Sequence, residues 1–205
     1  MQAKLKLCGI RTIESACVAA ACEVDFIGLN FTKTSRRRVE VGEARDIIAG
    51  VPDPGRLKLV GVFQNQLVSE VNEVARALRL DYVQLHGSET PAYCKRILVP
   101  IIKAFPLAPA FDPQVALESM EEYSMVSIYL VDRYQQGVGD ALDVEKVKIL
   151  TQHFPIMLAG GITIGNALKT IEYAQPFAID MASGIETNGI VDIEKVKEIA
   201  KLVKV

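Results

Sequence analysis

Residues 57–85, LKLVGVFQNQLVSEVNEVARALRLDYVQL, hold the pattern that decides the fold. The runs Leu57–Phe63 and Tyr82–Leu85 are short, apolar and nearly continuous, which is typical of parallel strands buried on both faces. Between them, apolar residues recur every three or four positions from Leu67 to Leu78, and this period predicts an amphipathic helix. The stretch therefore predicts a strand–helix–strand unit with parallel strands.

The same alternation extends along the whole chain. Strand-like runs lie at Lys4–Cys8, Asp25–Phe31, Leu57–Phe63, Tyr82–Leu85, Pro100–Phe105, Val126–Val131, Ile156–Ala159 and Pro176–Asp180. Eight such units predict one compact α/β domain over residues 1–205, a (β/α)8 TIM barrel, with an open doubly wound sheet as the alternative. We expect the fifth unit to be the weakest, because residues 106–113 contain three prolines.

The composition excludes several classes of protein. The 205 residues are 50% apolar and 23% charged, with a net charge of −2, whereas nucleic-acid binders usually carry a basic excess. No apolar run approaches the ~20 residues of a membrane span, and the N-terminus is too short and mixed for a signal peptide. Four cysteines without a CxxC pair and two histidines lack zinc-site spacing. We expect a cytoplasmic protein without metal, membrane or nucleic-acid partner.

Glycine turns follow three of the predicted strands. In a barrel of this kind the active site lies at the carboxyl ends of the strands. Bare backbone N–H groups in such turns can bind a phosphate, and tight turns without a ligand are the alternative interpretation. The predicted phosphate-binding residues, after the sixth, seventh and eighth strands, are Gly137, Gly139, Gly160, Gly161, Ser183 and Gly184.

Two reactive side chains end predicted strands. Cys8 ends the first, and a thiol in a polar barrel mouth can act as a base, although cysteine is more commonly a small buried hydrophobe. Asp132 ends the sixth, where a carboxylic acid can serve as general acid or simply cap the loop. From the first and sixth strands the two groups would reach a substrate from opposite sides of the mouth.

Further polar residues at the strand ends are candidates for substrate binding. The run Arg36–Arg38 either forms a solvated face or turns one arginine inward to pair a substrate carboxylate, and Arg37 is our candidate. His86 either donates a proton or makes hydrogen bonds in the core, and the residue alone favours the second. Gln84 and Asp180 end the fourth and eighth strands and complete the substrate-binding set.

Seven segments together resemble the phosphoribosylanthranilate isomerase family of tryptophan biosynthesis. The resemblance extends over nearly the whole chain, and the segments that carry it read KLCGI, DFIGLNFTKTSRRRV, VGVFQN, DYVQLHG, IIKAF, LAGGI and DMASGIE. The resemblance implies a cofactor-free Amadori rearrangement of a phosphorylated sugar–anthranilate. The sequence leaves both a monomer and a homodimer open. The resemblance places the base on Cys8, the acid on Asp132 and the carboxylate-pairing arginine on Arg37, with the phosphate on the glycine turns.

Departures from the family pattern keep two alternatives open. Arg133 and Asp140 stand in an unusual loop after the sixth strand, and a carboxylate near a phosphate is electrostatically unfavourable. One alternative is the related aminoaldose isomerisation of the histidine pathway, whose enzymes resemble this barrel but use two aspartates, with Cys8 standing where one of them would be. The other is a non-catalytic barrel that binds a phosphorylated ligand.

Overall fold

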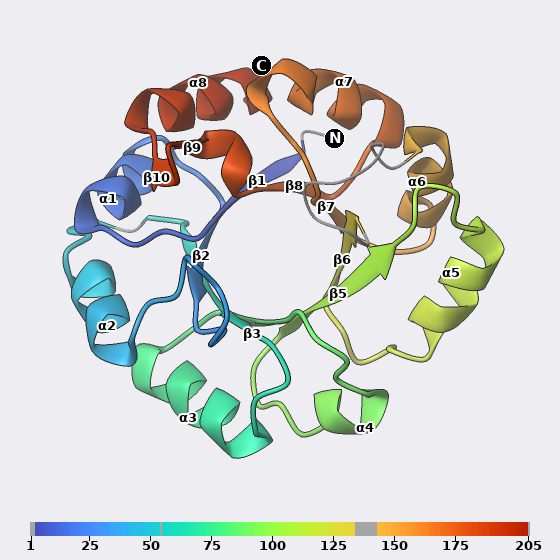
Figure 1. Ribbon diagram of the computed structural model, residues 1–205, viewed down its shortest axis with the longest axis horizontal. Coiled ribbons are helices and arrows are strands. Elements are labelled where there is room, and N and C mark those ends of the chain that lie inside the picture. Colours follow the sequence, from blue (N-terminus) through green and yellow to red (C-terminus); the bar gives the residue numbers. More distant parts are fainter. Residues whose placement is uncertain (1–2, 54, 134–142, 205) are drawn as a thin grey trace.

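The structure, a computed structural model, describes residues 3–53, 55–133 and 143–204, and its centre is a closed barrel of eight parallel strands (Figure 1). The strands, in barrel order, are β1 Lys4–Cys8, β2 Phe26–Asn30, β3 Lys58–Phe63, β4 Tyr82–Leu85, β5 Ile101–Leu107, β6 Ile128–Arg133, β7 Ile156–Leu158 and β8 Ala178–Met181. The first and last strands pair directly, with Lys6 opposite Asp180. This pairing confirms the (β/α)8 barrel and excludes the open sheet.

A ring of helices surrounds the barrel (Figure 1). The helices are α1 Ile13–Ala21, α2 Val41–Ala49, α3 Val68–Leu78, α4 Pro91–Cys94, α5 Pro113–Glu121, α6 Val144–Thr151, α7 Ile164–Ala174 and α8 Ile193–Val203. Several of these helices begin at a side-chain cap. Thr90 accepts a hydrogen bond from the Tyr93 amide, and Asp143 accepts one from the Glu145 amide.

The prediction that the fifth unit is the weakest is wrong. Strand β5 has seven residues and α5 has nine, whereas α4 in the fourth unit has only four. The prolines are compatible with both elements. Pro106 lies near the carboxyl end of β5, and Pro113 occupies the first turn of α5, where a missing N–H costs nothing.

The strands bury both faces in separate apolar clusters. One cluster joins the outward faces of the strands to the helices. The other consists of Phe26, Val60, Ile102, Ala104, Ile128, Leu130, Met157, Ala159 and Ala178. These residues alternate along their strands, so the second cluster fills the barrel interior. The same alternation, carried to the carboxyl ends, aims Cys8, Gln84, Asp132 and Asp180 into the barrel mouth.

A short hairpin follows the eighth strand. After the 3₁₀ turn Ser183–Ile185, β9 (Glu186–Thr187) pairs antiparallel with β10 (Ile190–Val191). The connecting residues Asn188 and Gly189 have φ angles of 53° and 77°, as a two-residue type I′ turn requires. The hairpin places Glu186 beside the loop that follows β2, where it contacts Arg37.

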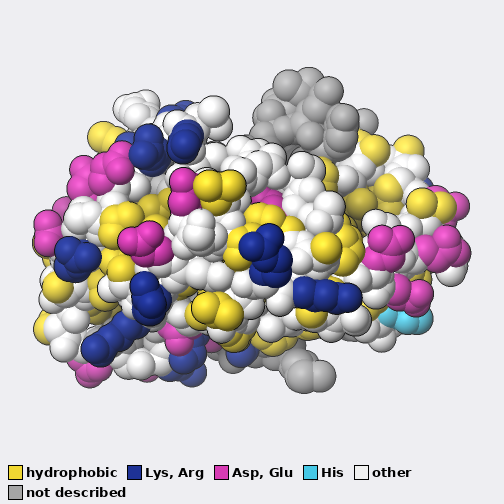
Figure 2. All heavy atoms as spheres, turned by 90° about the horizontal axis from the view of Figure 1, so that it is seen from below, with side chains coloured by type: hydrophobic (Ala, Val, Ile, Leu, Met, Phe, Trp, Pro, Cys, Tyr) yellow, Lys and Arg dark blue, Asp and Glu magenta, His cyan; other side chains and the backbone are white. Residues whose placement is uncertain are grey.

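On the face drawn in Figure 2, both signs of charge are spread among apolar and uncharged side chains, and neither sign gathers in one broad patch. Of the helices in the described part of the chain, none combines the length and apolar character that crossing a bilayer requires.

Candidate active site

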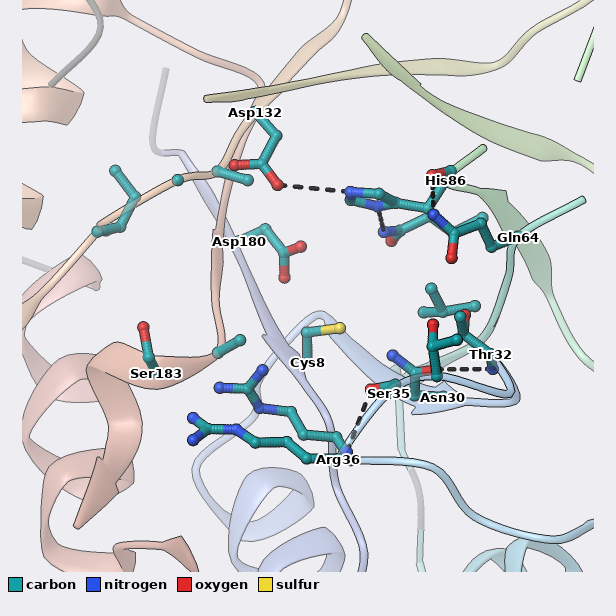
Figure 3. A pocket seen from close by; sticks show the side chains of 18 of the residues that line it. Cys8, Asn30, Thr32, Ser35, Arg36, Gln64, His86, Asp132, Asp180 and Ser183 are labelled. Carbon is teal, nitrogen blue, oxygen red and sulfur yellow. Dashed lines mark hydrogen bonds and ion pairs between the residues drawn. The ribbon is translucent and has the colours of Figure 1, made fainter. Parts of the chain in front are cut away.

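A cavity of about 590 Å³ opens at the carboxyl ends of the strands (Figure 3). Nine of the predicted site residues line it: Cys8, Arg37, Gln84, His86, Asp132, Gly160, Gly161, Asp180 and Ser183. Gly184 is not among the lining residues, and Gly137 and Gly139 lie outside the described residues. The rule that strand ends carry the site therefore brings together residues from β1, β4, β6 and β8.

Cys8 and Asp132 face the same cavity from opposite sides. Figure 3 shows the Cys8 sulfur on one side, the Asp132 carboxylate on the other and the Asp180 carboxylate between them. Both predicted groups are largely buried, with residue exposures of 9% for Cys8 and 5% for Asp132. A ligand in the cavity can therefore meet a thiol and a carboxyl group at once.

Burial and three charged groups determine the protonation of the Cys8 thiol. Burial raises its pKa, because the thiolate loses hydration, and the carboxylate of Asp180 adds to the rise. The positive charges of Lys6 and Arg37 lower the pKa and offset part of this effect. The net pKa lies above its ordinary value, so cations around the sulfur are what make a thiolate accessible.

His86 belongs to the cavity wall rather than the core. Its side chain is 29% exposed, and its Nε2 lies 3.5 Å from Asp132 Oδ2. Nδ1 lies 3.0 Å from the Gln84 amide nitrogen, which can only donate, so this network assigns the hydrogen of the neutral ring to Nε2, facing Asp132. The ring is hydrogen-bonded, as the sequence favours, but it is placed to orient the Asp132 carboxyl group.

A buried ion pair that the sequence analysis missed supports the His86 loop. Lys103 Nζ lies 3.2 Å from Glu89 Oε2 and donates to the carbonyl oxygens of Leu85 and Gly87. Glu89 in turn accepts from the amide of Gly87 at 2.9 Å. The pair thus fixes the chain on both sides of His86. A lysine inside the apolar strand IIKAF was the available signal, since a buried ammonium requires a partner.

Arg37 is held at the cavity rim by a carboxylate. Its Nε and Nη2 donate to Glu186 at 2.5 and 2.8 Å, and its stem lies over Gly9, where any β-carbon would overlap it. Gly9 has φ +85°, so the glycine serves both the turn and this close approach. Arg36 donates to the same carboxylate at 2.9 Å, whereas Arg38 pairs with Glu40. Two arginines beside one glutamate leave net positive charge at the rim.

The turns after β7 and β8 form another part of the cavity wall. Gly160 and Gly161 have φ angles of 82° and 85°, a region that glycine adopts without strain. A β-carbon at Gly184 would overlap the carbonyl oxygen of Ile162, so the two turns touch each other. Helix α7 begins shortly after the first of these turns, and its N-terminus places the positive end of the helix dipole near that turn.

The arrangement offers a ligand a thiol, a carboxyl group, cationic side chains and bare turns suited to a phosphate. Among residues 3–53, 55–133 and 143–204, no group of three or more His, Cys, Asp or Glu side chains has metal-site geometry. The side chain of Arg133 and all of Asp140 lie outside the described part, so the loop departures noted in the sequence have no structural account.

Fold and cavity define a (β/α)8-barrel protein whose cavity, suited to a small anionic molecule, has a thiol on one side and a carboxyl group on the other. A sequence model of the N-(5′-phosphoribosyl)anthranilate (PRA) isomerase family matches residues 5–202. The chain belongs to this family.

Relatives and solved structures support this membership. The chain is 34% identical to N-(5′-phosphoribosyl)anthranilate isomerase of Dehalococcoides mccartyi, over 98% of this chain and 95% of the relative. For the Pseudomonas putida enzyme the values are 38%, 97% and 96%. Among solved structures, phosphoribosylanthranilate isomerase of Thermus thermophilus superposes with a TM-score of 0.84 at 32% identity, and that of Thermotoga maritima with 0.88 at 28%. Each comparison covers 98% of both chains.

Proposed function

We propose that this chain is an N-(5′-phosphoribosyl)anthranilate isomerase, which converts its substrate to 1-(2-carboxyphenylamino)-1-deoxyribulose 5-phosphate in tryptophan biosynthesis. The observation that carries the proposal is the placement of Cys8 and Asp132 on opposite sides of one cavity. A solved relative, 28% identical with a TM-score of 0.85, holds the reduced form of this product.

The rearrangement begins with two proton transfers, one to the furanose ring oxygen and one from C2′, and both of these atoms are bonded to C1′. The Asp132 carboxylic acid gives its proton to the furanose ring oxygen, the bond from that oxygen to C1′ breaks, and the amine lone pair forms the C1′–nitrogen double bond. The Cys8 thiolate then removes the C2′ proton, the C2′–hydrogen bonding pair forms the C1′–C2′ double bond, and the π pair of the C1′–nitrogen double bond returns to nitrogen, which gives a neutral enolamine. Protonation of C1′ and loss of the enol proton give the ketone. Atoms and electrons balance without an oxidant, so the chemistry calls for no cofactor.

Opposite placement of acid and base suits this sequence of steps. The ring oxygen and the C2′ hydrogen lie on different sides of C1′, so one substrate pose can present each to its own group. His86, 3.5 Å from Asp132, orients the acid. Its hydrogen on Nε2 stabilises the carboxylate that remains after proton transfer.

Both ends of the substrate are anionic, one a carboxylate and the other a phosphate, whereas the sugar between them is uncharged. The guanidinium of Arg37 pairs the anthranilate carboxylate, since it is fixed at the rim and already aligned by Glu186. The phosphate lies on the turns of Gly160, Gly161, Ser183 and Gly184, near the N-terminus of α7. Asp180, between acid and base in the cavity, contacts the sugar.

The side-chain oxygen of Gln84 is a hydrogen-bond acceptor that a sugar hydroxyl could use. This oxygen is buried and finds no hydrogen-bond partner within the described part of the chain. A buried acceptor without a partner costs about 1–3 kcal/mol. A substrate hydroxyl that donates to this oxygen removes the cost only in the complex, and this favours binding of the polyhydroxylated sugar.

Turnover of freshly prepared phosphoribosylanthranilate, followed by loss of the substrate's fluorescence, tests the proposal. We expect activity in the wild type, and a loss of several orders of magnitude in kcat for Cys8→Ala and for Asp132→Asn. Cys17→Ala is the matched control, because that half-buried thiol on α1 does not line the cavity. Binding without turnover would select the non-catalytic alternative, and turnover of the histidine-pathway aminoaldose alone would select the other.

The biological setting follows from the proposed reaction. We place the enzyme in the cytoplasm as a single-domain catalyst, with the phosphorylated sugar–anthranilate as its small-molecule partner and no membrane or nucleic acid involved. Complementation of a tryptophan auxotroph tests the pathway. The Thermotoga maritima relative is described as dimeric, and sedimentation of this chain decides between monomer and homodimer.

A further inference from the structure

Lys6 is a charged residue inside the barrel to which the reaction steps above give no part. It lies on β1 two residues before Cys8, so both side chains point into the barrel. The lysine side chain is fully buried, and its Nζ makes an ion pair with Asp180 Oδ1 at 2.9 Å. Burying two charges costs hydration, and apolar side chains of similar volume stabilise a core at least as well. Stability alone therefore does not explain the pair.

A glycine on the neighbouring strand β2 leaves the Lys6 ammonium and the Cys8 sulfur close to each other. Gly28 of β2 lies opposite Cys8 in the strand register. A β-carbon at Gly28 would lie 2.9 Å from Cys8 Sγ and 3.4 Å from Lys6 Nζ. Both atoms thus border the same small space beside the glycine, and no side chain of β2 separates them.

The charges that face the sulfur come from three elements. Lys6 is on β1 itself, Asp180 is on β8 and Arg37 is on the loop after β2. Asp180 alone would oppose a thiolate, and its ion pair with Lys6 offsets that opposition. Lys6 favours a thiolate more strongly than Asp180 disfavours it, so the pair as a whole makes the sulfur more acidic than burial alone would.

We propose that Lys6 is a positioning residue for the Cys8 base: its ammonium, anchored by Asp180, stabilises the thiolate that takes the substrate proton. This inference rests on the proposed function for the role of Cys8 as base. The effect of Lys6 on the thiol does not depend on the proposed function, because the thiol can be titrated in the free protein. When the thiolate accepts the C2′ proton it becomes a neutral thiol, and the Lys6–Asp180 pair remains balanced in charge.

The pH dependence of Cys8 alkylation in the free protein tests the inference. Iodoacetamide is the probe, and peptide mass spectrometry follows each cysteine separately. In Lys6→Met we expect alkylation of Cys8 at pH 7.5 to fall by about tenfold or more, because each unit of pKa changes the thiolate fraction tenfold. In Lys6→Met/Asp180→Asn both charges are gone, so Cys8 should react at a rate between those of the wild type and the single variant.

A control and a fold marker separate this effect from structural damage. Lys4→Met removes a lysine from the same strand, two residues earlier, where its Nζ lies over the Phe177 ring at 4.8 Å, and it should leave Cys8 alkylation unchanged. Cys94 is buried and remote from the cavity lining, so its protection reports an intact fold. If Lys6→Met unfolds, the uncharged double variant decides, since it leaves no unpaired buried charge.

Outcomes on the thiol and on turnover are distinguishable. Wild-type alkylation of Cys8 in folded Lys6→Met, or in the folded double variant if the single one unfolds, overturns the inference, even if the enzyme is active. A wild type that does not turn over phosphoribosylanthranilate refutes the proposed function, while the thiol titration still decides the role of Lys6. If the proposed function and the role of Lys6 are both correct, the acid limb of the pH profile of kcat/KM moves to higher pH in Lys6→Met. The shift equals that of the pH profile of Cys8 alkylation.

Discussion

Gly28→Ala adds one methyl group at the centre of the proposed site, and its effect can be worked out from the contacts there. The new β-carbon would lie 2.9 Å from Cys8 Sγ and 3.2 Å from Cys8 Cα. The second contact is to backbone in a paired strand, so a side-chain rotation cannot relieve it. The sulfur must therefore move, or strands β1 and β2 must separate.

Two magnitudes follow from this contact. Overpacking of this kind costs about 1–3 kcal/mol, and in a chain of this size each kcal/mol lowers Tm by about 2–4 °C. A reacting group displaced by about 1 Å loses about a hundredfold in rate. We expect Gly28→Ala to remain folded, to lose a few degrees in Tm and to lose about two orders of magnitude in kcat/KM.

Thermal unfolding and the fluorescence assay measure the two effects on the same preparation. Gly42→Ala is the control, because a β-carbon there meets nothing within 4 Å and the residue lies in α2. An alanine in a helix is about 0.5–1 kcal/mol better than a glycine, so this variant should gain stability and keep its kcat/KM. Wild-type kcat/KM in Gly28→Ala would refute the assigned position of the sulfur.

Three other perturbations test the charged side chains. Arg37→Lys should raise KM about 10- to 100-fold with a smaller change in kcat, because the substrate carboxylate loses a planar two-point partner. Burial would raise the pKa of Glu186, but the hydrogen bonds and charge of Arg37 outweigh it and hold the pKa below the ordinary 4.5, so the carboxylate stabilises the fold above that pH. In urea unfolding, the advantage of wild type over Glu186→Gln should therefore shrink as pH falls through the folded-state pKa; an advantage independent of pH would contradict this. Lys103→Met should cost about 3–5 kcal/mol by leaving a buried carboxylate unpaired, against under about 0.5 kcal/mol for the exposed Lys197→Met.

The barrel could be predicted because its strands are buried on both faces. A run such as IML in β7 has no polar face to obscure it, and the helices between the runs show a clear three-to-four residue period. The strand-end rule then selects Cys8 and Asp132 without reference to any partner. The short helix α4 is harder to predict, because its single turn is set by the Thr90 cap and Pro91 rather than by periodicity.

The charged supports of the site were not predictable in the same way. Lys6 meets Asp180 across 174 positions of sequence, and Arg37 meets Glu186 across 149. Strand periodicity places Lys6 on the interior face but does not name its partner, because register between distant strands depends on barrel closure. A charged residue within an apolar strand is the local signal that such a partner exists.

Removal of the C2′ proton by the Cys8 thiolate is the step on which the proposed function depends. Substrate carrying deuterium at C2′ reports this step, with mass spectrometry following loss of the label under single-turnover conditions. We expect wild type to lose the label as product forms, and folded Cys8→Ala to retain both label and substrate. Release of the label by Cys8→Ala at the wild-type rate would show that Cys8 is not the base.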